Sequence, residues 1–448
     1  MKVLIIGGSD TGISTALRIR ELDENIKPLV IADNNYPNFS ICGIPFYVGG
    51  EVKHWQDLAH RTADDIRSKG IDLMLNTKVT VIKPESKQII VQNNNGEEQT
   101  LGYDKLVLGT GAKSVTPPIK GLDLEGVFKM RWMKDCRNFD QYLKQKQPKK
   151  GVIIGGGYVG LEMAEAMKNR GLDVTLLELE ETILNTVDKP LRKKVKQRLS
   201  AQGIKINTGT MVQEIIKQEN KLLVTAKGNF EIKADVVVVS AGARPNTGLG
   251  QKIGLETGLN QAYKVNQKME TSLSDIYAGG DCTETLNQIT GNYTYYALGT
   301  VAHKEGRIIG SNICGLERKF DGSLGTQSIK LFDTVVARTG FNEQEAREND
   351  FDPITVEITV HDHKVYYPPS YDTIVRVTAD KKTGRILGAQ ILGNINAEIS
   401  KRIDIFAAAI YNKMDYKNFN QLDLSYTPPL SSPWDPVQQA VQKLEQKL

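Results

Sequence analysis

The sequence has few cysteines and no long apolar run. Its 448 residues include only four cysteines, Cys42, Cys136, Cys282 and Cys314, and none of them forms a CxxC pair. This spacing fits neither a disulfide framework nor a zinc site. No stretch approaches the ~18 apolar residues of a membrane-spanning helix, and the first apolar run stops at Gly7, too early for a secretory signal. We therefore expect a cytoplasmic protein with reduced thiols, no metal site and no membrane contact.

A large excess of charge of either sign is also missing. The 57 basic and 53 acidic residues leave a formal net charge of +4, which is too small to indicate binding to nucleic acid. Apolar residues make up 40% of the chain and charged residues 25%, as in ordinary globular proteins. A chain of this length exceeds what one hydrophobic core supports and suggests about three domains.

What the sequence does contain is two glycine-rich turns, each between an apolar strand and a helix. In the first, a strand over residues 3–6 leads into "GGSDTG" (Gly7 to Gly12), and the next strand ends at Asp33. Such a turn presents a helix N-terminus to a pyrophosphate, and the acid can bind a ribose hydroxyl. Ser9 replaces the middle glycine of GxGxxG, so this copy alone is weak and could be an ordinary strand-to-helix turn.

The second glycine turn matches the full pattern. "GGGYVG" (Gly155 to Gly160) follows a strand over residues 152–154, and Glu178 ends the next strand 23 residues after Gly155. That offset is close to the expected value of about 20. Glu178 can accept ribose hydroxyls and would repel a 2′-phosphate, and no arginine follows to receive one. This unit therefore predicts binding of NADH, with NADPH less favoured.

Two dinucleotide units in one chain indicate hydride transfer from a nicotinamide to a flavin. Three further segments support this prediction, because each runs from an apolar strand into a turn: "YDKLVLGTGAKSVTPP" (103–118), "ADVVVVSAGARPN" (234–246) and "SDIYAGGDCTE" (274–284). In the last of them, Asp281 follows a Gly-Gly turn and could bind a ribityl hydroxyl of FAD.

The C-terminal part of the chain shows a different pattern. Apolar and polar residues alternate in "SIKLFDTVVARTGFNEQEA" (328–346) and in "DTIVRVTADKKTGRILGAQILG" (372–393), which predicts antiparallel strands. Residues 399–414 have the spacing of an amphipathic helix. Strand pairs and helices after an α/β region indicate a separate α+β domain.

With these motifs, the chain resembles the pyridine nucleotide–disulfide oxidoreductases over essentially its whole length. It is most similar to their single-cysteine branch, which holds coenzyme A disulfide reductases, persulfide reductases, NADH oxidases and NADH peroxidases. Three blocks carry this likeness: "FSICGIPFYVGG" (39–50), "HKVYYPP" (363–369) and "SYTPPLSSPWDP" (425–436).

The resemblance implies an α/β fold with two Rossmann-like dinucleotide-binding domains and a C-terminal α+β dimerisation domain. The expected FAD-binding domain is discontinuous and covers residues 1–112 and 236–320. The expected NAD-binding domain covers residues 113–235 between these two parts, and the dimerisation domain covers residues 321–448. The protein is accordingly expected to be a homodimeric flavoprotein that binds FAD and NADH.

The resemblance also makes Cys42 a redox-active cysteine beside the flavin. In dithiol relatives a second cysteine follows five residues later, but that position is Tyr47 here, so no intramolecular disulfide can form. A helix expected to begin near Cys42 would lower its pKa from about 8.5 toward neutrality or below, and the flavin would keep it a thiolate. The alternative is a buried, inert cysteine, which we also expect the other three cysteines to be.

The choice of reaction depends on the side chains around Cys42. Oxidases and peroxidases of the branch carry a histidine in the first glycine turn, and Asp10 stands there in this chain, which disfavours reduction of peroxide or oxygen. Disulfide reductases instead use tyrosines of the partner subunit. The matching residues are Tyr366 or Tyr367, together with Tyr426, and a phenol could orient or protonate the leaving thiolate. The alternative for the adjacent tyrosines is packing at an interface.

The sequence argues against coenzyme A disulfide as the preferred substrate. Coenzyme A disulfide reductases look as if they bind the nucleotide phosphates through basic residues of the first helix and near the C-terminus. Arg18 and Arg20 remain here, but Glu21 and Trp434 stand where an arginine and a lysine are expected. Each loss removes a phosphate-pairing cation worth ~1.5–3 kcal/mol. Three residues compensate only in part: Arg61, Lys69 and His303.

The resulting hypothesis is an NADH- and FAD-dependent reductase of a small thiol disulfide or persulfide. Two alternatives remain, an NADH oxidase or peroxidase that works through a Cys42 sulfenic acid, and a flavin-bound redox sensor. The contacts with FAD implied by the resemblance are Gly7, Gly8, Ser9, Gly12, Asp33, Val79, Thr110, Gly111, Gly280, Asp281 and Ala297. Those with NAD are Gly155, Gly157, Tyr158, Val159, Gly160, Glu162, Glu178 and Gly242. Those with substrate are Ser14, Arg18, Arg20, Asn38, Arg61, His303 and Trp434.

Overall fold

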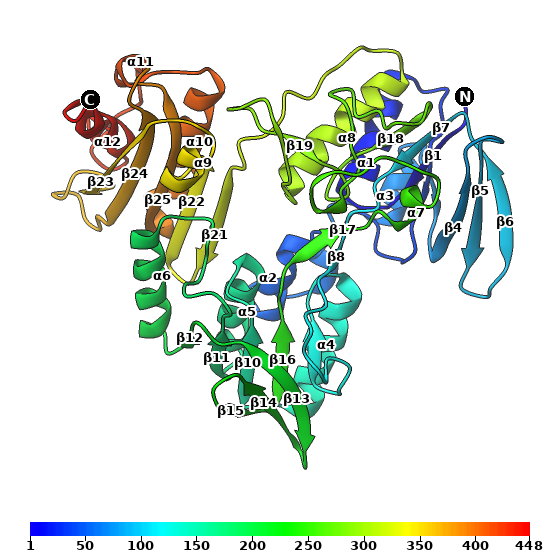
Figure 1. Cartoon of the computed structure of the whole chain (residues 1–448), viewed down its shortest axis with the longest axis horizontal. Helices are drawn as coiled ribbons and strands as arrows, with labels where there is room; N and C mark the ends of the chain where they lie inside the picture. The colour runs from blue at the N-terminus through cyan, green and yellow to red at the C-terminus, as the bar shows by residue number, and fades with distance from the viewer.

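The computed structural model describes all residues from 1 to 448 and shows three lobes (Figure 1). Two lobes are built on five-stranded parallel sheets, and the third on a five-stranded antiparallel sheet. The N-terminus and the C-terminus lie in different lobes (Figure 1). None of the helices combines the length and the apolar character needed to cross a membrane.

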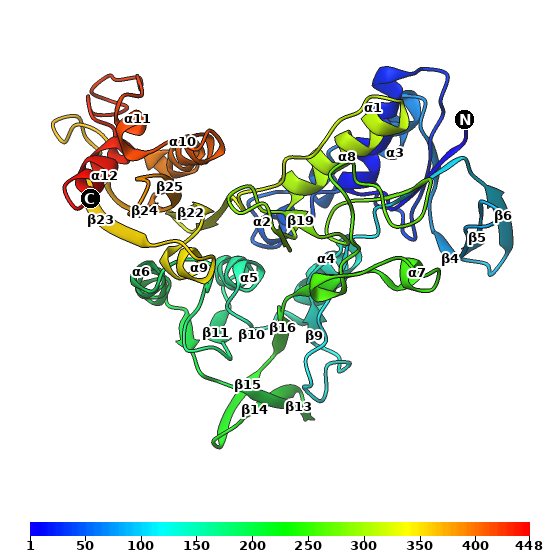
Figure 2. The ribbon, with the colours of Figure 1, turned by 45° about the horizontal axis from the view of Figure 1, so that its top comes forward.

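The first sheet joins strands from both ends of the region expected to bind FAD. Across the sheet, its strands are β18 (Ile276–Ala278), β7 (Lys105–Leu108), β1 (Val3–Ile6), β2 (Leu29–Ile31) and β3 (Asp72–Met74). The four residues of β1 are all buried, as expected for a central parallel strand covered on both faces. The helices α1 (Asp10–Leu22) and α8 (Gly299–Ile313) pack side by side in this lobe (Figure 2).

The second sheet follows the same plan around the second glycine turn. Across the sheet, its strands are β12 (Lys205–Asn207), β11 (Asp173–Leu177), β10 (Lys150–Ile154), β16 (Val236–Val239) and β9 (Val127–Lys129). Strand β16 was expected in the FAD-binding domain, but it forms parallel ladders with β10 and β9. The boundary expected between residues 235 and 236 therefore lies too early, because this apolar strand completes the second sheet.

The chain passes between these two lobes through a short ribbon. It is formed by β8 (Ala112–Ser114) and β17 (Ala243–Pro245), which pair in antiparallel fashion. Each of these two lobes also has an antiparallel three-stranded sheet. These sheets contain β4 (Thr77–Lys83), β5 (Gln88–Asn93) and β6 (Glu98–Gly102) in the first lobe, and β13 (Val212–Gln218), β14 (Lys221–Ala226) and β15 (Phe230–Ala234) in the second.

Helices and short strands complete the two nucleotide-binding lobes. The helices are α2 (Ile44–Val48), α3 (Ala63–Ser68), α4 (Met133–Lys146), α5 (Tyr158–Asn169), α6 (Lys189–Ala201) and α7 (Gly248–Gln251). A two-stranded sheet pairs β19 (Thr285–Leu286) with β20 (Tyr293–Thr294).

The C-terminal lobe confirms the predicted antiparallel strands and amphipathic helix. Across its sheet lie β21 (Gln327–Leu331), β22 (Thr334–Gly340), β25 (Ile386–Asn394), β24 (Asp372–Asp380) and β23 (Pro353–His361). The helices of this lobe are α9 (Glu343–Glu348), α10 (Ile399–Tyr411), α11 (Tyr416–Asn420) and α12 (Pro436–Glu445). The helix α10 buries one face, including Ile403 and Phe406, against the sheet.

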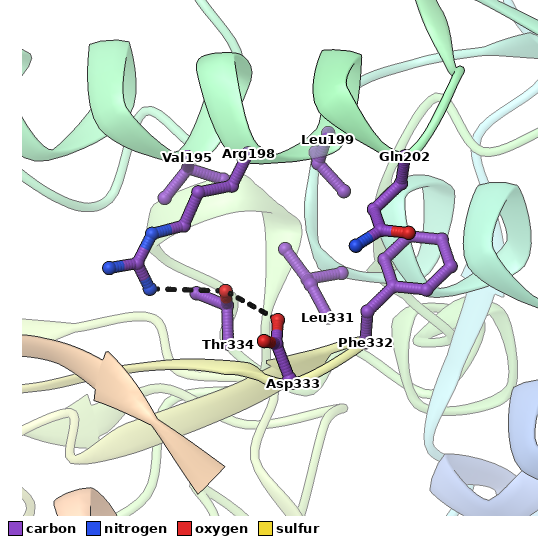
Figure 3. Close-up of a pocket in the computed structure, with 8 residues that line it drawn as sticks. All are labelled: Val195, Arg198, Leu199, Gln202, Leu331, Phe332, Asp333 and Thr334. Carbon is purple, nitrogen blue, oxygen red and sulfur yellow. Dashed lines mark hydrogen bonds between the residues drawn. The ribbon is translucent and has the colours of Figure 1, made fainter. Parts of the chain in front are cut away.

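The C-terminal lobe contacts the second lobe through the β21–β22 turn. Figure 3 shows this turn beneath α6, where Arg198 donates a hydrogen bond of 3.1 Å to Thr334. The cavity between them measures only ≈ 10 Å³, about the space of one water molecule. The lobes are therefore closely packed here, and this pocket offers no room for a substrate.

Candidate active site

Cys42 lies where two lobes meet. It belongs to a single turn of 3-10 helix, Ile41–Gly43, directly before α2, so the predicted helix does begin beside it. Residue Cys42 is exposed, and all four cysteines are unpaired. The helix α2 packs against α5 of the second lobe (Figure 2), and Glu162 of α5 is among the residues whose charge acts on Cys42.

Tyr47, which occupies the position of the second cysteine of dithiol relatives, holds α2 in place. Its hydroxyl donates a 2.8 Å hydrogen bond to the buried carboxylate of Asp140 in α4. Arg170, just after α5, donates to the carbonyl of Val48 and also contacts Asp140. Tyr47 is therefore a structural residue that joins the two lobes. Cys42 is the exposed cysteine at this junction, whereas Cys136 of α4 is buried in its core.

The charges around Cys42 do not favour its thiolate. Desolvation by the surrounding protein and the carboxylates of Glu162, Asp10 and Asp281 raise the pKa of the Cys42 thiol, and Arg131 opposes them only in part. The prediction that the nearby helix lowers this pKa was wrong. The helix α2 has only five residues, so its dipole is weak and is outweighed by three carboxylates.

The first glycine turn has the close backbone packing of a phosphate-binding turn. Gly7 has φ +116°, and an added Cβ would lie 2.0 Å from the carbonyl oxygen of Gly109. A Cβ on Gly12 would lie 1.9 Å from the carbonyl oxygen of Gly7. Ser9 precedes α1 without capping it through its side chain, which leaves the first N–H groups of the helix free for a pyrophosphate. This geometry fits the dinucleotide expected there.

The other residues expected to contact FAD follow the ends of the first sheet. Asp33 is exposed directly after β2, and Thr110 is anchored by a 2.7 Å hydrogen bond to the carbonyl of Asn246. Gly111 and Gly280 both have positive φ values, and Gly8 accepts a 2.7 Å bond from the backbone N–H of Asn38. Ala297 is exposed before α8. The side chain of Val79 lies in the core, so only its backbone could face a cofactor.

Two ionisable residues that sequence analysis missed hold the Asp281 loop. Arg131 forms a 2.8 Å ion pair with Asp281. Glu305, which is fully buried in α8, accepts a 2.6 Å hydrogen bond from the N–H of Gly280. Burial raises the pKa of Glu305 to about 8, so this acid is largely protonated at neutral pH. Neither residue belongs to a sequence motif, so only the folded chain identifies them.

The second glycine turn also fits a dinucleotide. Gly155 has φ +110°, and a Cβ on Gly160 would lie 2.0 Å from the carbonyl oxygen of Gly155. Gly157 precedes α5, and a Cβ added there would meet nothing within 4 Å, which leaves open space at the helix N-terminus. Glu178 follows β11 and accepts hydrogen bonds from the N–H groups of Gly156 and Glu180.

The remaining residues expected to contact NAD surround this turn. Gly242 has φ +94° with open space around it, and Val159 is exposed on α5. The Tyr158 hydroxyl lies 3.2 Å from that of Thr186. Glu162 lies one turn further along α5, where burial and the neighbouring Glu165 raise its pKa to about 7.

Several residues expected to contact substrate lie on α1 and α8. Ser14 Oγ lies 2.7 Å from His303 Nδ1, so the fold brings these two predicted residues together. Arg18 donates to Ser311 and to Glu21, and Glu21 also pairs with Arg307. Glu21 therefore contacts two arginines at once, and these interactions lower the pKa of its carboxyl.

Arg20 and Asn38 differ in their surroundings. The Arg20 guanidinium donates to the carbonyls of Ile26 and Lys69, so it closes the end of α1 and does not join the substrate residues. Asn38 is fully buried and accepts a 3.2 Å hydrogen bond from Arg61. Its side-chain N–H group has no partner in the chain, which leaves a free donor beside the first glycine turn.

The three predicted tyrosines belong to the C-terminal lobe, whereas α2 lies in a different lobe (Figure 1). Tyr366, Tyr367 and Tyr426 are exposed. Desolvation and the nearby Tyr426 both raise the pKa of the Tyr366 phenol. This proximity favours Tyr366 as the partner of Tyr426. Trp434 is also exposed.

A buried ion pair holds together the loops that carry these tyrosines. Arg402 of α10 forms a 3.1 Å ion pair with Asp435 and donates to the carbonyls of Asp362 and Leu430. His363 bridges Asp362 to the carbonyl of Tyr367, with both hydrogen bonds at 2.8 Å. The two tyrosine loops therefore form one unit.

Comparison with known proteins decides the family. The model of the pyridine nucleotide-disulphide oxidoreductases matches residues 1–306, and the model of their dimerisation domain matches residues 326–436. The chain belongs to the pyridine nucleotide-disulphide oxidoreductase family. It is accordingly an oxidoreductase that uses FAD and a nicotinamide dinucleotide.

Several relatives resemble this oxidoreductase over nearly its whole length. The NAD(P)H sulfur oxidoreductase (CoA-dependent) of Pyrococcus furiosus is 36% identical, over 97% of each chain. An NADH oxidase of Methanocaldococcus jannaschii is 32% identical, over 100% of this chain and 99% of the relative. The solved structure of an NAD-dependent persulfide reductase from A. fulgidus superimposes with a TM-score of 0.96 at 35% identity, covering 100% of this chain and 83% of that one.

The charge of Glu162 beside Cys42 leads to a prediction for this oxidoreductase. Glu162→Gln removes the carboxylate that contributes most to the raised pKa of Cys42 after desolvation. The pH midpoint for alkylation of Cys42 should therefore fall, by on the order of one unit. The measurement is the rate of iodoacetamide labelling of the Cys42 peptide against pH. Glu231→Gln, which changes an exposed residue of β15, is the control, and equal midpoints in the two variants would contradict the prediction.

Proposed function

We propose that this protein is an NADH-dependent flavoprotein that reduces a small thiol disulfide or a persulfide through Cys42. The observation that carries the proposal is an exposed, unpaired cysteine at the junction of the two dinucleotide-binding lobes, with Tyr47 bound to Asp140 where a second redox cysteine would stand. Without a partner thiol in the chain, Cys42 must form its disulfide with the substrate. The four unpaired cysteines fit a reducing compartment such as the cytoplasm.

Cys42 and the tyrosines have different roles in the proposed reaction. The Cys42 sulfur attacks one sulfur of the substrate, a new S–S bond forms with Cys42, and the second sulfur leaves with the electron pair of the broken bond. FAD, when bound, would supply the two electrons of the nicotinamide hydride to the Cys42–substrate disulfide, whose S–S bond then breaks and frees Cys42 and the second product. Tyr366 and Tyr426 of a partner subunit would orient the substrate, since they lie in the segment matched by the dimerisation domain, far along the chain from Cys42. This arrangement requires a homodimer.

The identity of the disulfide is part of the proposal. The two relatives whose printed names mention sulfur or persulfide support a small sulfur substrate. Glu21 occupies the guanidinium groups of Arg18 and Arg307, so these cations are not free for the phosphates of coenzyme A. We therefore place a persulfide, or a disulfide with fewer negative charges, ahead of coenzyme A disulfide.

One contact also favours a second candidate function, the reduction of oxygen or peroxide. Asp10 in the first glycine turn lies 3.5 Å from Nε2 of His303, so the fold supplies a histidine where the sequence has an acid. The relative of Methanocaldococcus jannaschii bears the name NADH oxidase. In this candidate, Cys42 would cycle through a sulfenic acid.

The role of Cys42 can be tested by its replacement. Cys42→Ser should retain flavin and still transfer hydride from NADH to it, while disulfide reduction falls by at least about 10³-fold, because the attacking sulfur is lost. Stopped-flow absorbance separates the two half-reactions. The control is Cys314→Ser, which removes a partly exposed cysteine of no proposed function. Full turnover by Cys42→Ser would exclude Cys42 as the nucleophile.

The preference for NADH can be tested at Glu178. Glu178→Gln keeps an acceptor for the Gly156 N–H group but removes the charge that repels a 2′-phosphate. The ratio of kcat/KM for NADH to kcat/KM for NADPH should therefore fall by about tenfold. Glu219→Gln, at an exposed hairpin of the same lobe, should leave the ratio unchanged. Equal use of both dinucleotides by the unmodified enzyme would contradict the proposal.

The choice of substrate can be tested at the two residues that disfavour coenzyme A. Glu21→Gln frees Arg18 and Arg307, and Trp434→Lys adds a cation, so the double variant should lower the KM for coenzyme A disulfide by about tenfold. The KM for the neutral disulfide of mercaptoethanol should change little. If the unmodified enzyme already uses coenzyme A disulfide best in a screen with persulfides and other disulfides, our substrate assignment is wrong.

A further inference from the structure

His303 of α8 is held at both ring nitrogens by residues of α1. Its Nδ1 atom lies 2.7 Å from Ser14 Oγ, and its Nε2 atom lies 3.5 Å from a carboxylate oxygen of Asp10. The two helices pack directly on each other, so the imidazole is oriented by the fold. About 45% of the His303 side chain remains exposed, which allows exchange of protons with solvent.

Asp10 and Cys42 interact electrostatically. The charge of Asp10 is one of those that raise the pKa of the Cys42 thiol. Burial raises the pKa of Asp10 itself, with His303 and His60 opposing this rise and Asp281 adding to it. The first glycine turn, which contains Asp10, accepts a 2.7 Å backbone hydrogen bond at Gly8 from Asn38, four residues before Cys42. The Asp10–His303 pair therefore lies beside the segment that carries the reactive sulfur.

We propose that the Asp10–His303 pair donates the proton to the thiol that leaves when Cys42 attacks a disulfide. This role rests on the proposed function. The Cys42 thiol first loses its proton to solvent, and the thiolate bonds to one substrate sulfur. The substrate S–S bond breaks with its electron pair on the other sulfur, and that sulfur takes the proton from Nε2 of His303. Asp10 and Ser14 keep the imidazole in position, and solvent returns a proton to the pair. The step needs no oxidant or reductant beyond the substrate itself.

Acidity favours an imidazolium over a phenol in this step. An ordinary alkyl thiol has a pKa of about 8.5, an imidazolium about 6.5 and a phenol about 10. Proton transfer to the leaving sulfur is therefore downhill from an imidazolium and uphill from a tyrosine, and the pKa of the Tyr366 phenol is raised further. Within this division of roles, Tyr366 and Tyr426 orient the substrate and His303 protonates it.

The test compares two disulfides that differ in the acidity of the leaving thiol. The disulfide of mercaptoethanol releases an alkyl thiol that needs a proton, whereas the aromatic disulfide of thionitrobenzoate releases a thiolate that is stable without one. His303→Gln should lower kcat/KM for the first by about 10²-fold and for the second by no more than a few fold. Asp10→Asn should show the same selectivity. Lys304→Gln, an exposed neighbour on α8, is the matched control and should change neither value.

The outcomes separate this inference from the proposed function. Flavin absorbance and the rate of flavin reduction by NADH report whether each variant is folded and loaded. Equal losses on both disulfides in His303→Gln and in Asp10→Asn, with normal flavin reduction, would overturn the proton-donor role. Failure of the unmodified enzyme to reduce either disulfide would instead contradict the proposed function.

Discussion

The close packing of α2 against α5 is the contact on which the active-site geometry depends. A Cβ added to Gly49 would lie 3.2 Å from Cα of Ala166, so the two backbones are almost in contact there. Tyr47 and Arg170 fasten the same contact through Asp140, a buried acid that each of them reaches from a different segment. Because α5 begins at the second glycine turn, this packing sets the sulfur of Cys42 relative to the proposed nicotinamide site.

The same region gathers carboxyl groups that retain protons more strongly than usual. Burial raises the pKa of Glu162 to about 7 and that of Glu305 to about 8, and it also raises the pKa of Asp10. Asp281 is paired with Arg131. Of these acids, Glu162 and Asp10 act on the Cys42 thiol, and a raised pKa in each of them limits the negative charge that builds up around the sulfur.

Local patterns were sufficient for the elements that repeat or alternate. The two glycine turns, the strands that enter them and the antiparallel strands of the C-terminal lobe could be predicted, because each depends on residues close together in the chain. The position of β16 could not be predicted, because the apolar residues of a buried strand do not indicate which of the two parallel sheets the strand joins. The hydrogen bond from Arg20 to the carbonyl of Lys69 could not be predicted either, because only the fold brings that carbonyl to α1.

The sequence by itself determined the family, the class of cofactors and the single cysteine at the head of α2, since these depend on residue types at fixed spacing. Only the tertiary structure decided how charge is distributed around that cysteine. Asp10, Glu162 and Asp281 are separated by more than a hundred residues from one another, yet all three act on Cys42, and His303 meets Asp10 only because α8 packs on α1. Electrostatic effects depend on distance in space and on burial, and neither quantity is encoded in any short stretch of the chain.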